Sequence, residues 1–584
     1  MPPASPAFLP VSAPPIAFSA AHPSALRKTF LLPPRSSRKP FLLSPHRLPN
    51  SPLVTASATD AATEDEHWDA VIIGSGFGGL SCAAALTAYG FRTLVLESHY
   101  AAGGVAHGFQ AKTTAGVFHF DTGPSFFCGL STPGSLCPVK HALDAVDERV
   151  HCVSYDRFCI DDVRRGTVEV CTDEAVTLAS VERIAGNAAR RELARFYAEM
   201  RAMHAAMDVP AIALRGDWRV APVVLRRWAG SLARLAPYVA SIKRPVRVVM
   251  DRVGVRDGFV KQLLDTEAFL LSGLKTEQTI TAEIAFMVGE RAKPGAIEYP
   301  VGGARAVVDA LVRGVTRKGG EVRLRAHVEE ILVERGTAVG VRTRKKKRIF
   351  AKHVFSNASL WDTVQHLLPE GAVPDAYRAQ AMGTPTVESF MHAHLGIPSG
   401  GLGDVIGHHA VILDSRRDIT ARGNTVMISI PTVWSEGLAP EGWHVVHAYT
   451  LEPYDGWEAL AKDRAAYGDA KKKAAEPLLA AVRHVIPDLD ERLQAEGAVM
   501  KLGSPVTHAR FTRRYRGTYG AAIDAGEAEF EWPGDVPVER LKRCSDSAFP
   551  GIGVPSSAAA GLIAANEVVG IQEHNRLVDK VFPK

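Results

Sequence analysis

The sequence predicts an α/β protein in which a dinucleotide-binding domain of the Rossmann type carries an inserted α+β domain. A short apolar strand runs directly into a glycine-rich loop at 74–79, and strand and helix patterns that fit the same sheet recur at 296–370 and after 505. The 584 residues are 46% hydrophobic and 22% charged, which is the composition of a globular protein. We find no apolar run of the ~18–20 residues that a membrane-spanning helix needs.

The first 59 residues differ in composition from the rest. They contain no Asp or Glu, six Lys or Arg and 13 of the 37 prolines. A basic leader without a continuous apolar core is typical of an organelle transit peptide, and we expect residues 1–58 to be a disordered plastid transit peptide. A plain disordered tail is the alternative. The rest of the chain has a net charge of −1, which removes the support for nucleic-acid binding.

Cysteines and histidines are the candidates for a metal site. The seven cysteines include no C-x-x-C pair, which argues against a disulfide framework and a zinc cluster and favours a reducing compartment. His392 and His394 have the alternation of a strand, whereas His408 and His409 have only Asp404 close before them. We expect core or surface histidines and no metal.

The glycine-rich loop lies between a strand and a helix. The β-branched run 68–73 predicts a buried parallel strand. An alanine-rich helix is expected over 80–89, and a second strand over 91–96 ends at Glu97. The loop between the first strand and the helix reads Gly74-Ser75-Gly76-Phe77-Gly78-Gly79. Strand, G-x-G-x-x-G, helix, strand and acid in this order indicate a bound dinucleotide.

Each position of this fingerprint has a physical role. Gly74 allows the tight turn, Gly76 lets a pyrophosphate approach the backbone, and Gly79 permits close packing of helix on strand. The exposed N–H groups at the start of the helix attract the phosphates. Glu97 is placed to bind the hydroxyl groups of the adenosine ribose.

Motifs beyond the fingerprint carry a resemblance to a known family. The pair Gly103-Gly104 follows Glu97-Ser98, and Phe120-Asp121-x-Gly123 lies further along. Near the C-terminus, Cys544-Ser545-Asp546-Ser547 precedes Gly553-Val554 and an alanine-rich helix over 558–569. With this set the chain resembles the FAD-containing superfamily of phytoene desaturases, carotenoid isomerases and amine oxidases. Three stretches narrow the resemblance to the plastid carotenoid isomerase (prolycopene isomerase) family: 298–303, 354–363 and 516–520.

The resemblance implies a cofactor and a reaction. The cofactor is FAD, held without a covalent link. The reaction is the cis-to-trans isomerisation of a poly-cis carotene by reduced FAD in the plastid. Two alternatives remain open: a carotenoid or retinoid desaturase or saturase with net redox change, and a non-catalytic plastid protein that binds flavin and a polyene.

The resemblance also assigns positions. The backbone of Val328 lies at the adenine, and Asp546 binds the ribityl chain or the pyrophosphate. The residues expected to hold FAD are Gly74, Gly76, Phe77, Gly78, Gly79, Glu97, Ser98, Gly103, Gly104, Val328, Asp546, Gly553 and Val554. Three positions depart from the pattern. Val105 stands where desaturases have Arg, Ala521 where the isomerase has Pro, and Ser545 where Gly is usual. Serine fits there only if its φ is negative.

The motifs divide the chain into two domains. We expect the FAD-binding domain at 66–150, 296–370 and 505–575, and a substrate- and membrane-facing domain at 151–295 and 371–504. Alternation over 387–395, 425–430 and 443–450 predicts an antiparallel sheet in the later insert, whereas the earlier insert is predicted to be a mostly helical cap.

The helical insert has an amphipathic segment at 223–244. Its apolar stripe is expected to lie in the membrane interface, with arginines at 226, 227, 234 and 244 on the other side. The alternative is a cap helix packed on the body and kinked at Pro237. The stripe consists of Leu225, Trp228, Leu232, Leu235, Val239 and Ile242.

Two acidic residues are candidates for catalysis. Glu267 and Glu283 lie among apolar residues, so either could face a hydrophobic substrate tunnel as a proton donor with a raised pKa. Acids in such places more often end a helix or pair with a base. The sequence indicates no other catalytic residue.

Overall fold

The computed structural model describes residues 65–522, 525 and 534–583, all within one compact unit. The predicted transit peptide at 1–58 lies outside the described residues. Among the described helices, none combines the length and the apolar character that crossing a membrane requires.

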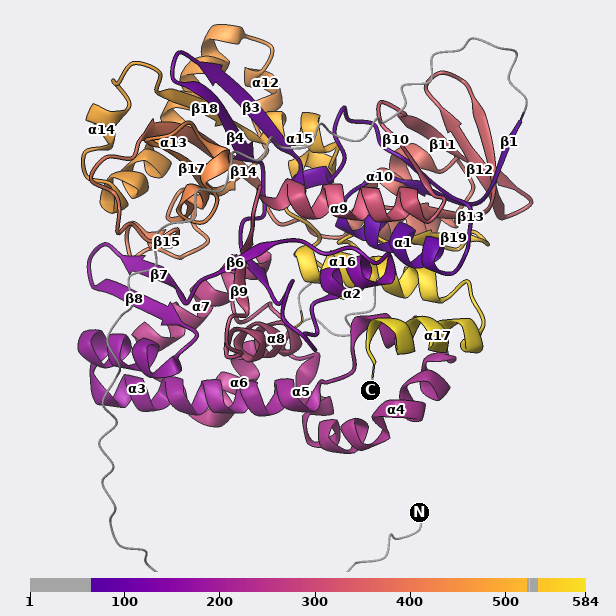
Figure 1. Ribbon diagram of the computed structural model, residues 1–584, viewed down its shortest axis with the longest axis horizontal. Coiled ribbons are helices and arrows are strands. Elements are labelled where there is room, and N and C mark those ends of the chain that lie inside the picture. Colours follow the sequence, from indigo (N-terminus) through magenta and orange to yellow (C-terminus); the bar gives the residue numbers. More distant parts are fainter. Residues whose placement is uncertain (1–64, 523–524, 526–533, 584) are drawn as a thin grey trace, which may run out of the picture. The chain divides into compact units, whose positions relative to one another are not determined.

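One sheet carries the glycine-rich loop (Figure 1). Its strand order is β10-β2-β1-β13-β12-β11, with β19 paired to β13. The β11–β12 and β12–β13 pairs are antiparallel, whereas the other pairs are parallel. The strands are β1 (Glu66–Ile73), β2 (Thr93–Leu96), β10 (Glu321–Arg323), β11 (Val328–Glu334), β12 (Thr337–Thr343), β13 (Arg348–Ser356) and β19 (Leu541–Arg543). Three distant chain segments meet in this sheet, which confirms the predicted α/β fold.

The second half of β1, residues 70–73, is buried on both faces. Ala70 and Ile72 pack into the core that the helices form, whereas Val71 and Ile73 pack into a second core that includes residues of β11 and β12. A strand buried on both sides reads as a continuous β-branched run, which is why this element could be recognised from sequence. The helices of the first core are α1 (Phe77–Ala88), α2 (Pro138–Ala145), α9 (Ala304–Arg317), α16 (Val554–Asn566) and α17 (Ile571–Val581).

A second seven-stranded sheet belongs to the inserted part, in the order β18-β14-β17-β16-β15-β7-β8. The prediction that 151–295 is mostly helical misses β7 and β8, whose inward residues Phe158, Ile160, Val168 and Val170 are buried. All strand pairs are antiparallel except β7–β15, which is parallel. The strands are β7 (Arg157–Asp162), β8 (Gly166–Cys171), β14 (Ser389–Pro398), β15 (His408–Ile412), β16 (Thr425–Ser429), β17 (Trp443–Glu452) and β18 (Val499–Gly503).

Helices cover both faces of this second sheet. α13 (Arg464–Val485) packs on one face, and α3 (Glu174–Ala206), α6 (Val246–Val253), α7 (Gly258–Ser272) and α8 (Thr281–Arg291) form the core on the other. The small strands are β3 (Gly108–Thr113), β4 (Gly116–Asp121), β5 (Phe127–Cys128), β6 (Cys152–Ser154) and β9 (Ile297–Pro300). The remaining helices are α4 (Val220–Leu235), α5 (Val239–Ile242), α10 (Leu360–Asp362), α11 (Asp375–Gly383), α12 (Trp457–Leu460), α14 (Leu489–Arg492) and α15 (Pro505–Thr512).

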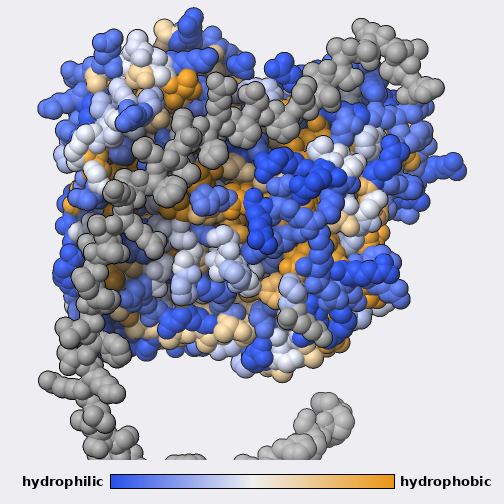
Figure 2. All heavy atoms as spheres, viewed as in Figure 1, coloured by the Kyte–Doolittle hydropathy of each residue, from blue (hydrophilic) through white to orange (hydrophobic). Residues whose placement is uncertain are grey.

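The amphipathic segment at 223–244 is not one continuous helix. α4 breaks at Trp228, whose backbone leaves the helical region at φ −118° and ψ 22°. The Trp228 side chain is buried beside Phe582 and Val578, so the prediction that it faces a membrane is wrong. The lower rim in Figure 2, where Figure 1 places α4, mixes hydrophilic and apolar spheres. The members of the stripe that are exposed are Leu225, Leu232 and Val239.

Candidate functional site

A cleft of about 910 Å³ opens at the carboxyl ends of the parallel strands β1, β2 and β13. Its floor includes Ile73, Leu96 and Asn357, the residues at or just after these strand ends. In parallel α/β sheets ligands bind at this edge, where strand ends and helix N-termini converge. The cleft runs from Val328 on β11 to Gly553 at the start of α16.

The glycine-rich loop adopts the backbone conformation that the sequence predicts. Gly74 has φ +93°, which an L side chain rarely adopts. At Gly79, a Cβ atom would lie 2.2 Å from the carbonyl oxygen of Gly74, so only glycine lets the helix approach the strand. Gly78 plays a similar part, because a Cβ there would lie 1.9 Å from the carbonyl oxygen of Cys544. Gly78 and Gly79 are therefore packing positions and do not line the cleft.

Asn357 lines the cleft beside the glycine-rich loop and was not singled out from the sequence. It follows β13, and its Nδ2 atom would lie 2.8 Å from a Cβ placed on Gly76. Its backbone N–H donates to the carbonyl oxygen of Ile73, which ties it to the end of β1. Asparagine belongs to the 354–363 stretch that carries the resemblance, but its place over the glycine loop appears only when β1 and β13 pair.

Glu97 is buried at the cleft wall and anchors the loop. Its Oε2 atom accepts hydrogen bonds from the backbone N–H of Ser75 at 2.9 Å and from the Ser75 hydroxyl at 2.6 Å. Its Oε1 atom accepts from the backbone N–H of His99 at 2.7 Å. The Ser98 hydroxyl also donates to Oε1 at 3.3 Å. These four contacts use the roughly four acceptor positions of the carboxylate, so a ribose hydroxyl would replace the long bond from Ser98.

The second glycine pair completes this wall. Gly103 and Gly104 have φ +116° and +58°, and a Cβ on Gly104 would lie 3.1 Å from the Cα atom of Gly76. Phe77, Ser98 and Val105 line the cleft beside them.

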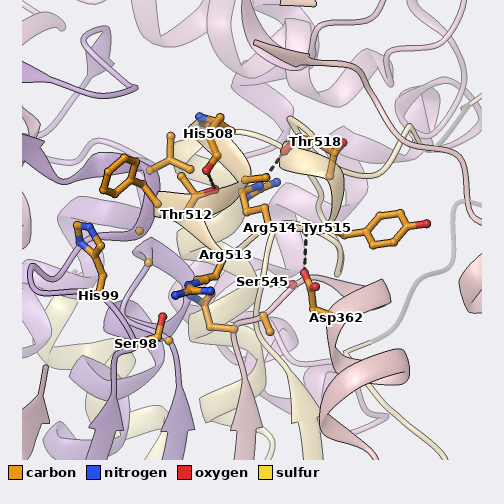
Figure 3. Close-up of a pocket in the computed structure, with 18 of the residues that line it drawn as sticks. Ser98, His99, Asp362, His508, Thr512, Arg513, Arg514, Tyr515, Thr518 and Ser545 are labelled. Atoms are coloured by element: carbon orange, nitrogen blue, oxygen red, sulfur yellow. Dashed lines mark hydrogen bonds between the residues drawn. The ribbon is translucent and has the colours of Figure 1, made fainter. Parts of the chain in front are cut away.

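The C-terminal motif forms the opposite wall. Asp546 pairs with Arg514, whose Nη2 atom lies 2.6 Å from Oδ2. Arg514 also donates from Nε to the carbonyl oxygen of Thr518 at 2.8 Å (Figure 3) and from Nη2 to that of Tyr519. Ser545 keeps its φ out of the left-handed region, so serine fits without strain. Figure 3 also shows Arg513 projecting toward Ser98 in the same part of the cleft. Neither arginine was recognised from sequence.

These features fit FAD, the cofactor that the sequence predicts. The first turns of α1 and α16 have no side-chain cap at Gly76 or Gly553, so their N–H groups are available to a ligand. Helix N-termini of this kind bind phosphate and other electron-rich groups. Gly74, Gly76, Phe77, Glu97, Ser98, Gly103, Gly104, Val328, Asp546, Gly553 and Val554 all line the one cleft.

The two candidate acids have different surroundings. Glu267 is buried and accepts from Arg291 Nη1 at 2.7 Å and from the Tyr197 hydroxyl at 2.9 Å. Glu267 does not line the cleft, and this pairing does not fit a proton donor. Glu283 also lies outside the lining. Its carboxyl group has no hydrogen-bond partner among the described residues, and burial raises its pKa to about 8.

The histidines of the second sheet come together in the fold. His392 lines the cleft, and His447 and His508, which the sequence spacing gave no reason to single out, lie beside it. His409 Nδ1 lies 2.8 Å from Asp161 Oδ2. His408 bonds Ser125 and Tyr155. These contacts place His408 and His409 within the structure of the sheet, away from the cleft.

Comparison with known proteins gives a family and a set of relatives. Residues 77–569 match the model of the flavin containing amine oxidoreductases. The chain is 28% identical over 571 residues to prolycopene isomerase 1, chloroplastic, of an Oncidium hybrid cultivar, covering 94% of this chain and 93% of the relative. It is 27% identical over 372 residues to human all-trans-retinol 13,14-reductase, covering 58% and 56%. A Methanosarcina mazei oxidoreductase shares the fold, with a TM-score of 0.55, 16% identity, and coverage of 85% and 100%.

We predict that Gly76→Val protein is purified without flavin. A side chain at this position collides with Asn357 and blocks the backbone that would face the pyrophosphate. The measurement is the ratio of flavin to protein absorbance after gel filtration. Gly468→Val is the matched control, because nothing lies within 4 Å of a Cβ there. Full loading of Gly76→Val protein would show that the loop does not face the cofactor.

We also predict that Glu97→Ala and Asp546→Ala each weaken FAD binding about tenfold to a hundredfold. A hydrogen bond to a charged group contributes about 1.5–3 kcal/mol, and tenfold in affinity corresponds to about 1.4 kcal/mol. Fluorescence titration of apoprotein with FAD measures the affinity, with Glu321→Ala outside the cleft as control. Unchanged affinity of the Glu97 variant would contradict its assignment to the ribose.

Proposed function

Because the chain belongs to the flavin containing amine oxidoreductase family and uses FAD, we propose that it isomerises a poly-cis carotene from cis to trans in plastids. The observation that carries the proposal is similarity to a chloroplastic prolycopene isomerase over nearly the full length of both chains. Similarity to a retinol reductase points to the same substrate chemistry, a long apolar polyene.

The cleft supports a polyene substrate near Gly553. Phe390, Tyr449 and Tyr519 line this end, and the Phe390 and Tyr519 rings lie 4.9 Å apart in an edge-to-face arrangement. Burial raises the pKa of Tyr449 to about 12, so its hydroxyl stays neutral. Neutral aromatic groups bind a flat apolar chain and exclude water.

Different residues of the chain bind the nucleotide and position the substrate-facing segment. FAD, when bound, supplies the electron density that lowers the order of a polyene double bond. The glycine loop with Asn357 and Glu97 holds the nucleotide end. Arg514, fixed by Asp546, orients the segment that carries Tyr519. Cofactor and substrate are thereby held in a fixed relative position, which is the protein's contribution to such chemistry.

Incubation of the FAD-loaded protein with poly-cis carotenes in liposomes, under anaerobic reducing conditions, tests this function. We expect a product of unchanged mass with a more trans absorption and retention. A product two hydrogens heavier or lighter would favour a saturase or desaturase. FAD that dithionite reduces, without any product, would favour the non-catalytic flavin-binding protein. Gly76→Val protein serves as the cofactor-free control.

We further propose that the protein attaches peripherally to the plastid membrane through the α4 surface, defined as Trp218, Leu225, Leu232 and Val239. The exposed fractions of these side chains are 78%, 54%, 37% and 57%. So many exposed large apolar side chains within one segment are unusual. Lys243 and Arg244 are exposed next to them. Apolar side chains beside basic ones favour an anionic lipid interface, where a membrane-dissolved substrate is found.

We predict that protein lacking the leader co-sediments with anionic vesicles and that Leu225→Asp/Leu232→Asp protein does so less while keeping FAD. Charged side chains cannot enter the acyl boundary, and both residues lie outside the cofactor cleft. Val163→Asp, at an exposed apolar residue of the β7–β8 turn, is the matched control. Equal sedimentation of the double variant and the control would contradict the role of this surface.

A further inference from the structure

Four imidazoles are buried side by side at the wall of the cleft. His392 and His394 lie two residues apart on β14, and His447 on β17 stands directly opposite His394. His508 on α15 stacks on His392 with ring centroids 5.4 Å apart. The exposed fractions of the four residues lie between 3% and 7%. His392 and His508 line the cleft, together with Phe390, Tyr449 and Tyr519.

Two of these imidazoles form a hydrogen-bonded pair. His392 Nδ1 lies 3.0 Å from His447 Nε2, so one nitrogen donates to the other. We call these two residues the histidine pair. Its outer atoms, His392 Nε2 and His447 Nδ1, are buried and have no partner among the described residues. By contrast, His394 is anchored, because its Nε2 atom bonds the carbonyl oxygen of Asp121 at 3.1 Å.

The histidine pair leaves part of its hydrogen-bonding capacity unused. Each neutral imidazole has one N–H donor and one lone-pair acceptor. The bond inside the pair uses one of each, so one N–H and one lone pair remain buried without a partner. Buried polar groups are usually satisfied, and an exception calls for an explanation. The free lone pair is a place where the histidine pair can take up a proton.

The groups around the histidine pair favour its neutral form as long as no anion is bound in the cleft. Burial lowers the pKa of both His392 and His447 well below the usual value, and the neighbouring histidines lower it further. Among the described residues, the other groups around the cluster add no free anion. The Asp546 carboxylate is paired with Arg514, and Tyr449 and Tyr519 have raised pKa values. The Asp121 carboxyl group, whose pKa burial raises to about 6, accepts from the Tyr299 hydroxyl and the Ala304 N–H.

His107 and Lys501 are two further titratable neighbours among the described residues. Burial lowers the pKa of His107, whose ring bonds the carbonyl oxygen of Gly104 at 2.7 Å. Lys501 on β18 lies opposite His394 in the antiparallel β14–β18 register, and its side chain is exposed. Neither supplies negative charge. An anion entering the cleft would therefore be the main influence that raises the pKa of the pair, since a nearby opposite charge favours the protonated form.

We propose that the His392–His447 pair takes up a proton when FAD in the cleft is reduced, and so couples proton uptake to electron uptake. The inference rests on the FAD site and deepens the proposed function. Two electrons come from a small-molecule reductant, for which dithionite stands in the experiment and is oxidised to sulfite. They enter FAD together with the protons that the flavin itself binds. One further proton, from water, goes to the free nitrogen of the pair, and reoxidation returns it.

The proton bound by the histidine pair can catalyse the proposed isomerisation. The protonated pair can transfer its proton to a polyene carbon. The N–H bond breaks and its electron pair stays on the nitrogen, the electron pair of the double bond forms the new C–H bond, and the positive charge passes to the other carbon of that double bond. The former double bond is then a single bond and can rotate. Return of the proton to the same nitrogen restores the double bond, with no net redox change.

The test is the dependence of the FAD midpoint potential on pH, measured without any carotene, so that its result is independent of the isomerase proposal. For a two-electron couple, one additional proton steepens the slope by about 30 mV per pH unit. The extra proton binds between the pair's pKa in the oxidised protein, well below 6.5, and its raised pKa in the reduced protein. We expect a steeper slope in this interval and a shallower one above it.

Three forms of the protein are compared: wild type, His392→Gln/His447→Gln, and His409→Gln as the control outside the cleft. Wild type and control should share the steep slope, and the double variant should lose up to about 30 mV per pH unit. Identical slopes in all three forms would overturn the proposal.

Two further measurements keep the proposal testable if the double variant does not fold. Nitrogen-15 histidine spectra of wild-type protein should gain an imidazolium signal on reduction, and an unchanged set of imidazolium signals would overturn the proposal. Metal analysis of the same sample covers a competing arrangement, because ligand atoms of His392, His394 and His447 lie within 4.8 Å of one another. One equivalent of transition metal would overturn the proposal, since the free lone pairs would then be occupied.

Discussion

The close approach of three backbone segments at the glycine-rich loop is the constraint on which the rest of the molecule depends. A Cβ on Gly78 would lie 1.9 Å from the carbonyl oxygen of Cys544, and one on Gly561 would lie 2.1 Å from that of Gly78. α1, α16 and the C-terminal motif therefore meet at contacts that only glycine permits. Because these segments are far apart in sequence, the long inserts between them must fold as separate layers around the cleft.

The same contacts determine the electrostatics of the site. They bring the uncapped N-termini of α1 and α16 to one cleft and set Glu97 and the Arg514–Asp546 pair on its walls. The end at the first turn of α1 has N–H donors and the Glu97 carboxylate, whereas the end at Gly553 combines the N–H groups of α16 with aromatic side chains and neutral histidines. This polarity matches a dinucleotide that presents its ring system to an apolar substrate.

Local sequence patterns predicted much of the FAD-binding fold and of the candidate site. A strand buried on both faces, a glycine fingerprint and an acid after the next strand specify their own conformations, and the structure shows each of them. Residues whose role depends on distant pairing were not predictable. Asn357 reaches the loop only because β13 pairs with β1, and His447 reaches His392 only through the register of β14 and β17. The amphipathic stripe misled at Trp228, because helical periodicity does not reveal the break in α4 there or the burial of this side chain against α17.

The central claim is that one cleft holds FAD with its ring system at the aromatic and histidine-lined end. An experimental structure of residues 59–584, purified with the cofactor, tests this most directly. The account predicts the pyrophosphate over the first turn of α1 and the isoalloxazine ring between the start of α16 and His392. A flavin ring placed at the Val328 end, or outside this cleft, would contradict it.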